Sequence, residues 1–237
     1  MTTFHGRIDS PSVRRLFERD PRQAVVSISA AQRRPVADLD VNWVGTIHHG
    51  LDLASNYELG SGDGGYLAFV GRSAAEKGLA TAIRVALRAG MPIKIAARIG
   101  PADREYHESE VVPLLRHPLV HWLGEIPDEH KARLLAHARA LLMPIEWDEP
   151  FGLSFIESLA AGTPIITRPM GALPELMIHG EHGFFGDSED ELLEACMRID
   201  TIDRPGCRRW ALDRFSASRM ADDYEDAYRR VLEASLD

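Results

Sequence analysis

The chain has 237 residues, of which 45% are hydrophobic and 27% charged, and its formal net charge is -9 at pH 7. These fractions are typical of a globular protein with a full core, and the negative charge argues against a nucleic-acid partner or attachment to an anionic membrane by charge alone. The sequence has no apolar run long enough to span a bilayer. Its two cysteines, Cys196 and Cys207, form no disulfide framework, so we expect a cytoplasmic protein.

Residues 1–55 predict a small region of mixed structure. A helix is expected over Pro11–Arg19, and strands are expected over residues 25–29 and 43–47. Residues 56–65 contain four glycines, which predicts a linker to the rest of the chain.

From residue 66 to 214, short apolar strands alternate with amphipathic helices. The expected strands are 66–70, 93–97, 120–123, 140–143 and 164–167. The expected helices are 77–89, 106–115, 128–137, 153–161 and 173–178. This alternation predicts an α/β domain of the Rossmann-like type, with a parallel sheet buried on both faces.

Two further helices are expected towards the C-terminus. Ser188 and Glu191 form a capping box that predicts a helix start. Residues 216–236 predict one long helix, which we expect to cross back towards residues 1–55. Its apolar stripe, expected to pack against the body, consists of Met220, Tyr224, Ala227, Tyr228 and Val231.

The first candidate site follows the strand 66–70. Gly71 ends this strand, and Arg72 and Lys77 lie in the loop that leads to the next helix. Ligands of open α/β sheets bind at the carboxyl ends of the strands, and two cations beside a helix start could hold a diphosphate. On this segment alone, an ordinary loop with a charged rim explains the pattern equally well.

The second candidate site contains two carboxylates, Glu149 and Glu157, which are eight positions apart. Glu149 lies in the loop before the expected helix 153–161, and Gly152 lies near the helix start. Glu157 lies within this otherwise apolar helix, so its charge needs a partner. A ribose or sugar hydroxyl would serve, and so would a structural arginine.

Together, these residues resemble the donor site of glycosyltransferase family 4, whose GT-B fold has two facing Rossmann-like domains. The run from Gly171 to Phe184 carries the same resemblance. The resemblance implies that Arg72 and Lys77 hold the donor diphosphate. It also implies that Glu149 contacts the transferred sugar and Glu157 contacts the nucleotide ribose.

The resemblance extends to the amides around Phe151, Gly152 and Leu153, which we expect to face the sugar or its phosphates. His5, in the run from Thr3 to Gly6, looks like the family's strand-end histidine near the donor sugar. A surface histidine near a terminus is the alternative.

The family also implies a domain organisation. Residues 1–55 match a residual part of the N-terminal acceptor-side domain, residues 66–214 match the donor-binding domain, and residues 215–237 match the helix that crosses back. The first strands of the N-terminal domain have no counterpart here. We therefore expect a partner chain or self-association to cover this incomplete domain.

The expected function is retaining, metal-independent transfer of a hexose from a UDP- or GDP-sugar donor to an unknown acceptor. Beyond the donor substrate, no cofactor is expected. His117 and His121 are separated by Pro118, so a helical metal pair is not expected either. Three alternatives stay open: a non-catalytic nucleotide-sugar binding fragment, a degenerate product, and a sugar-nucleotide epimerase with the GT-B fold.

Overall fold

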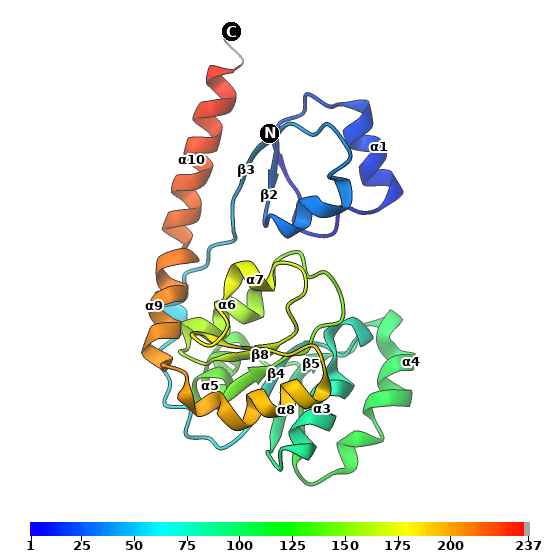
Figure 1. Cartoon of the computed structure of the whole chain (residues 1–237), viewed down its shortest axis with the longest axis vertical. Coiled ribbons are helices and arrows are strands. Elements are labelled where there is room, and N and C mark those ends of the chain that lie inside the picture. The colour runs from blue at the N-terminus through cyan, green and yellow to red at the C-terminus, as the bar shows by residue number, and fades with distance from the viewer. Residues whose placement is uncertain (235–237) are drawn as a thin grey trace.

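The computed structural model describes residues 1–234, which form two parallel sheets, one in each of two lobes of the molecule (Figure 1). The smaller sheet has the order β1-β2-β3, and the larger sheet has the order β6-β5-β4-β7-β8-β9. The α/β class and the parallel sheet predicted from the sequence are confirmed. The strands are β1 (Thr2–Thr3), β2 (Val25–Ser27), β3 (Trp43–Thr46), β4 (Leu67–Arg72), β5 (Ile93–Arg98), β6 (Val120–Gly124), β7 (Ala140–Leu142), β8 (Ile165–Thr167) and β9 (Gly183–Phe185).

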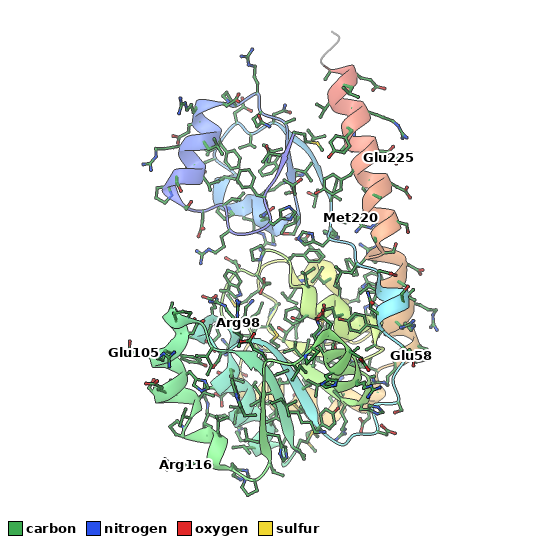
Figure 2. The ribbon with its side chains drawn as sticks, turned by 180° about the vertical axis from the view of Figure 1, so that it is seen from behind. Glu58, Arg98, Glu105, Arg116, Met220 and Glu225 are labelled. Atoms are coloured by element: carbon green, nitrogen blue, oxygen red, sulfur yellow. The ribbon has the colours of Figure 1, made fainter. Side chains whose placement is uncertain are left out.

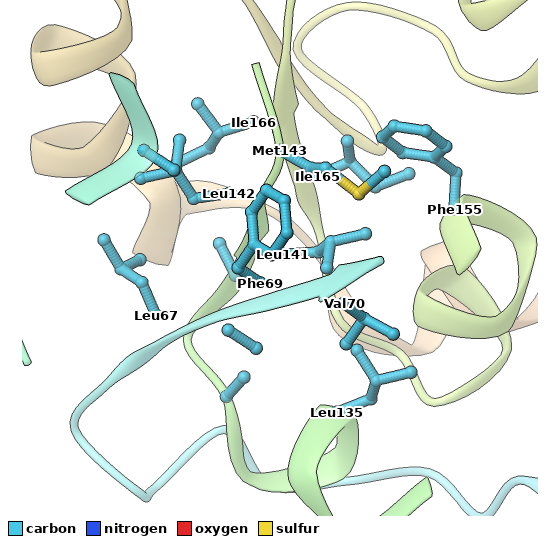
Figure 3. Packing of buried hydrophobic residues seen from close by; sticks show 14 of the residues in the cluster. Leu67, Phe69, Val70, Leu135, Leu141, Leu142, Met143, Phe155, Ile165 and Ile166 are labelled. Atoms are coloured by element: carbon cyan, nitrogen blue, oxygen red, sulfur yellow. The ribbon is translucent and has the colours of Figure 1, made fainter. Parts of the chain in front are cut away.

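Helices cover the larger sheet, with α3 packed against α8 and α6 packed against α5 and α9. The α-helices are α1 (Pro11–Arg19), α2 (Leu53–Asn56), α3 (Leu79–Arg88), α4 (Arg104–Tyr106), α5 (Asp128–His137), α6 (Leu153–Ala160), α7 (Leu173–Leu176), α8 (Glu189–Arg198), α9 (Arg204–Arg214) and α10 (Ala217–Glu233). Figure 3 shows how Leu67 and Phe69 of β4 lie beside Leu141 and Leu142 of β7 in this core. The central strands are covered on both faces, which explains why they read as continuous apolar runs.

Two parts of the larger domain differ from the prediction. The helix expected over residues 106–115 is divided into α4, a π-helical turn at His107–Val111 and a 3-10 turn at Leu114–Arg116. Pro113 interrupts it because proline has no N–H to donate to the preceding turn. Strand β9 was not predicted, because it has only three residues and begins with a glycine. Any other residue at position 183 would place its Cβ 2.0 Å from the carbonyl oxygen of Ile165.

The predicted start of α8 is confirmed. The hydroxyl of Ser188 accepts a hydrogen bond from the amide of Glu191 at 3.2 Å. The Glu191 carboxylate accepts from the amide of Asp187 at 2.7 Å, one residue earlier than in the usual capping box. The first contact satisfies an N–H group that the helix itself leaves free, and the second holds the residue before the cap.

The small sheet has its own modest core. Phe17 of α1 packs with Ile8, Val25 and Val36, and all four are almost fully buried. Helix α1 has the predicted bounds, with the Ser10 hydroxyl accepting from the amide of Val13 at 3.3 Å. So few buried side chains contribute little stabilisation, and this region therefore depends on contacts with the rest of the chain.

Helix α10 supplies one of these contacts, since it runs beside the small sheet (Figure 1). Ala227 is fully buried against Val26 and Ile47, and Met220 lies where α10 leaves the larger domain (Figure 2). Tyr228 was predicted to pack as well, but it is 55% exposed. Residues 235 and 236 of the predicted helix lie outside the described residues.

The segment 56–65 is fastened to the larger domain by Arg204. The guanidinium of Arg204 donates to the carbonyl oxygens of Gly60, Ala136 and Ala138 at 3.0 Å each, and to the hydroxyl of Thr163 at 2.7 Å. Burial lowers the pKa of this guanidinium. One side chain thus joins the predicted linker to the segments that precede β7 and β8.

We predict that Arg204→Met lowers the free energy of unfolding by about 3 kcal/mol, because several part-buried acceptors would lose their donor. Urea denaturation measures this change. The matched control is Arg209→Met on the same helix. The side chain of Arg209 is 68% exposed and contacts Asp203, so its loss should cost less than about 0.5 kcal/mol. Equal effects of the two variants would contradict the role of Arg204.

Candidate functional site

The site lies at the carboxyl ends of β4 and β7, which pair directly in the middle of the larger sheet. The loops after these strands meet closely. Gly78 has φ of 70°, and a Cβ there would lie 2.0 Å from the carbonyl oxygen of Pro144. The amide of Glu146 also donates to the carbonyl oxygen of Glu76 at 2.8 Å. This close approach brings the two predicted motifs together.

Lys77 and Glu149 form an ion pair across the two loops. Their side chains are 15% and 9% exposed. The indole N–H of Trp147 donates to the same Glu149 oxygen at 3.1 Å, and the Lys77 ammonium lies 4.7 Å from the centre of the Trp147 ring. A fixed ammonium group in this half-buried position could hold an anionic oxygen.

Arg72 lies at the end of β4, on the same edge of the sheet. Its guanidinium pairs with Glu76 and with Asp103, the latter at 3.1 Å, and its side chain is about one-third exposed. The structure therefore places Arg72 at the last position of β4 and Lys77 in the loop that follows. Arg72 is paired with two carboxylates and Lys77 with one. A bound anion would have to compete with these carboxylates for the two cations.

Helix α6 begins at this edge with Gly152 as its N-cap. Gly152 has φ of 101°, a value that favours glycine, and no side chain caps the first amides of the helix. Leu153 is 44% exposed, whereas the ring of Phe151 is buried against His49 and Phe215. The Phe151 side chain is thus a packing residue. Gly71 of β4 lies beneath the loops, with the methyl group of Met143 3.5 Å from where a Cβ would be.

Glu157 lies one turn further along α6 and is paired with Lys131 of α5. The ammonium of Lys131 is 2.9 Å from Glu157 Oε1 and 3.0 Å from Asp128 Oδ1. The protein partner proposed from the sequence was an arginine, and the structure supplies a lysine instead. Glu157 and Lys131 line a pocket of about 450 Å³ that also includes Tyr57 and Asn56.

His5 follows β1 and faces the larger domain through a chain of rings. It stacks on His49 with ring centres 5.2 Å apart, and His49 meets the edge of Phe151 at 4.9 Å. Burial, together with the nearby His5 and His48, lowers the pKa of His49 to about 4, so His49 is neutral at pH 7. The structure therefore brings His5 to the boundary between the two sheets.

Sequence reasoning gave no role to Glu175, which joins the two sheets. The carboxylate of Glu175 on α7 accepts hydrogen bonds from the amides of Ala30 and Ala31 at 2.9 and 2.8 Å, and it lies 3.0 Å from His48 Nε2. Ser29 adds a hydrogen bond from its hydroxyl to the carbonyl oxygen of Pro150 at 2.7 Å. Glu175 is part of the run that carries the family resemblance, but its partners lie more than 120 residues earlier, so local pattern gave no signal.

A cleft of about 310 Å³ opens beside these contacts. Residues from both sheets line it, among them Arg7, Gln32, Trp147, Glu149 and Gly171. Within residues 1–234, no three His, Cys, Asp or Glu side chains gather as a metal site. No helix in the described part of the chain is both long and apolar enough to cross a membrane.

Residues 58–201 match the family model described as Glycosyl transferases group 1. The match covers more than half of the chain, so the chain belongs to this family. The alpha-maltose-1-phosphate synthase of Mycolicibacterium smegmatis is 24% identical over 244 residues, covering 88% of this chain and 63% of that protein. The glycogen synthase of Mycobacterium tuberculosis is 30% identical over 165 residues, covering 67% of this chain and 39% of that protein.

Solved structures show the same fold. Sucrose-phosphate synthase from Thermosynechococcus elongatus has a TM-score of 0.78 at 21% identity, covering 95% of this chain and 63% of that one. Anabaena Alr3699/HepE in complex with UDP has a TM-score of 0.83 at 17% identity, covering 96% and 71%. The predicted GT-B type of α/β fold is confirmed. This chain spans about 63% of the length of the maltose-1-phosphate and sucrose-phosphate synthases.

We predict that the Glu175 contacts make stability depend on pH. Burial by itself raises the pKa of this carboxyl, but hydrogen bonds from His48, Ala30 and Ala31 outweigh burial and hold the pKa below its ordinary value of 4.5. A carboxyl with a lowered pKa stabilises the folded state above its ordinary pKa, and this contribution is lost as pH falls through the folded value.

The free energy of unfolding should therefore fall more between about pH 7 and pH 3.5 in the unmodified chain than in Glu175→Gln. Chemical denaturation at the two pH values measures the difference. Glu181→Gln, an exposed position on the same segment, is the control and should keep the full pH dependence. An identical slope for Glu175→Gln and the unmodified chain would contradict the prediction.

Proposed function

We propose that this chain forms the donor-binding part of a retaining, metal-independent glycosyltransferase of family 4, which transfers a hexose from a UDP- or GDP-sugar. The observation that carries the proposal is the ion pair of Lys77 with Glu149 at the carboxyl ends of β4 and β7, beside the uncapped start of α6. The group 1 glycosyl transferase match favours transfer over epimerisation. The structurally similar HepE was solved in complex with UDP, which supports a uridine nucleotide as one candidate donor.

The diphosphate would lie between the β4–α3 loop and the start of α6. During transfer, the bond between the anomeric carbon and the phosphate oxygen breaks, and the diphosphate leaves with the bonding electrons. The acceptor oxygen forms the new bond to the anomeric carbon and gives its proton to the departing phosphate oxygen. Arg72, Lys77 and the free amides of α6 would stabilise the charge that grows on the leaving group. This arrangement would provide the electrostatic catalysis that other transferases obtain from a metal.

Glu149 would position the transferred sugar. Lys77 and the Trp147 indole hold its carboxylate, and its backbone is held too, since the amide of Ala172 donates to the Glu149 carbonyl oxygen at 2.9 Å. A fixed carboxylate can orient sugar hydroxyl groups, and orientation alone can lower a barrier by several kcal/mol. We therefore assign Glu149 the role of positioning the sugar. The proposal that the configuration at the anomeric carbon is retained comes from the family resemblance. His5 would approach the sugar from the smaller sheet.

The acceptor would enter from the side of residues 1–55. The small sheet on that side ends at β1, which among the described strands pairs only with β2. We propose that a partner chain or a second copy of this chain completes it, because an open strand edge readily pairs with another strand. The two cysteines are buried free thiols, in keeping with the proposed cytoplasmic location.

Calorimetric titration of the purified chain with UDP, GDP and ADP, in the presence of a metal chelator, tests the proposal. We expect one nucleotide to bind without divalent metal, and that nucleotide identifies the donor base. The matching nucleotide-sugar is then offered to the chain, and release of the diphosphate measures reaction. If no nucleotide binds to the folded chain, the proposed donor site is wrong. Binding without turnover favours a non-catalytic binding fragment.

We predict that Arg72→Ala and Lys77→Ala each weaken binding of that nucleoside diphosphate by about 1.5–3 kcal/mol, the usual contribution of a charge-assisted hydrogen bond. Calorimetry measures both affinities. Arg84→Ala is the control, because Arg84 pairs with Glu189 on α8 and lies away from the strand ends. Unchanged affinity in both test variants would contradict the assignment of Arg72 and Lys77 to diphosphate binding.

Glu157→Ala should distinguish the contribution of the ribose to binding from that of the phosphates. We expect weaker binding of the nucleoside diphosphate, by roughly 1–3 kcal/mol, because a ribose hydroxyl would lose a charged acceptor. The affinity for inorganic pyrophosphate should stay within about twofold, because pyrophosphate has no ribose. Equal losses for the two ligands would remove Glu157 from the ribose role.

A further inference from the structure

Lys131 has no role in the site described so far, yet it makes a defined contact with it. Its ammonium lies between Glu157 Oε1 at 2.9 Å and Asp128 Oδ1 at 3.0 Å. The side chains of Lys131 and Glu157 are only 18% and 12% exposed, whereas that of Asp128 is 94% exposed. Lys131 therefore joins a half-buried carboxylate on α6 to a solvent-facing carboxylate at the start of α5.

Tyr57 closes the same pocket from the segment that connects the two sheets. Its side chain is almost fully buried, and burial followed by the charge of Glu157 raises the pKa of its hydroxyl. Burial alone would lower the pKa of Lys131, but contacts with Glu157 and Asp128 outweigh it and raise the pKa above its ordinary value. Lys131 is therefore a cation, and Tyr57 is a neutral hydroxyl, at neutral pH.

The ion pair with Lys131 fixes the orientation of the Glu157 carboxylate. A carboxylate inside an apolar helix would turn its charge towards water unless a cation held it. Lys131 engages one oxygen of Glu157, and a carboxylate has about four lone-pair sites in all. Glu157 is thus held in one orientation, and its remaining lone pairs can accept hydrogen bonds from two neighbouring hydroxyl groups. A ribose presents such a pair of hydroxyl groups.

We propose that Lys131 is the positioning residue for ribose recognition: it fixes the Glu157 carboxylate so that Glu157 accepts hydrogen bonds from the 2′- and 3′-hydroxyls of the donor nucleotide. Lys131 acts through Glu157 and does not touch the ligand. The inference rests on the proposed function, in which Glu157 contacts the ribose. It assigns to this pocket the discrimination between ribonucleotides and deoxyribonucleotides.

The test compares three ligands by calorimetry: the ribonucleoside diphosphate that binds, its 2′-deoxy form, and inorganic pyrophosphate. The unmodified chain should prefer the ribonucleotide over the deoxynucleotide by about tenfold or more, which corresponds to ~1.4 kcal/mol. In Lys131→Met this preference should fall to within about twofold, with pyrophosphate affinity unchanged. A purely structural defect would instead weaken all three ligands together.

The matched control is Lys94→Met. Lys94 is a partly buried lysine of β5 whose ammonium lies 3.8 Å from the centre of the Tyr66 ring, outside the pocket, so the preference should persist. Where Lys131→Met does not fold, Lys131→Gln serves, because it keeps a donor for Glu157 but removes the charge. The preference should fall there too, and an unchanged preference in a folded Lys131 variant would overturn the inference.

Two further outcomes separate this inference from the proposed function. In a Glu157→Ala background, Lys131→Met should change the ribose preference no further, since the two residues act as one unit. An additional fall would show that Lys131 contacts the nucleotide itself and would overturn its positioning role. No ribose preference in the unmodified chain would overturn the ribose role of Glu157 and this inference with it. Ribose preference that survives in Lys131→Met overturns the inference alone and leaves the proposed function intact.

Discussion

The parallel pairing of β4 with β7 is the constraint on which the rest of the site depends. These strands are far apart in the sequence but adjacent in the sheet, so the loops that follow them must share one edge. At this point of the sheet the chain order reverses, which is where open α/β folds bind ligands. The close approach at Gly78 then leaves Lys77 and Glu149 within contact of each other.

Each of the two carboxylates flanking the start of α6 is paired with a lysine from another element. Lys77 comes from the loop after β4, and Lys131 comes from α5. Part-buried ion pairs contribute little net stability, because removing the charges from water offsets their attraction. In the proposed function their value is positional: Glu149 and Glu157 would be held in fixed orientations before the ligand arrives, and Lys77 would be held beside the proposed diphosphate.

The smaller sheet is attached to the larger domain by three kinds of contact. Glu175 supplies charged hydrogen bonds to the amides of Ala30 and Ala31, the stacked His5 and His49 rings reach Phe151, and α10 packs along β3. A core as small as that of this sheet would not hold its strands alone. Ala31, whose amide donates to Glu175, also lines the cleft of about 310 Å³, so the attachment and the cleft share this residue.

The sequence by itself determined the α/β class and most of the strands and helices, and it gave Arg72, Lys77, Glu149 and Glu157 as candidate site residues. It could do so because buried parallel strands read as apolar runs, and helix starts such as Ser188 carry their own polar caps. Only the tertiary structure decided that Lys131 is the partner of Glu157, that Glu175 joins the two sheets, that Tyr228 stays exposed, and that β9 exists. These features depend on contacts between residues far apart in the chain, and no local pattern records which distant group fills a given space.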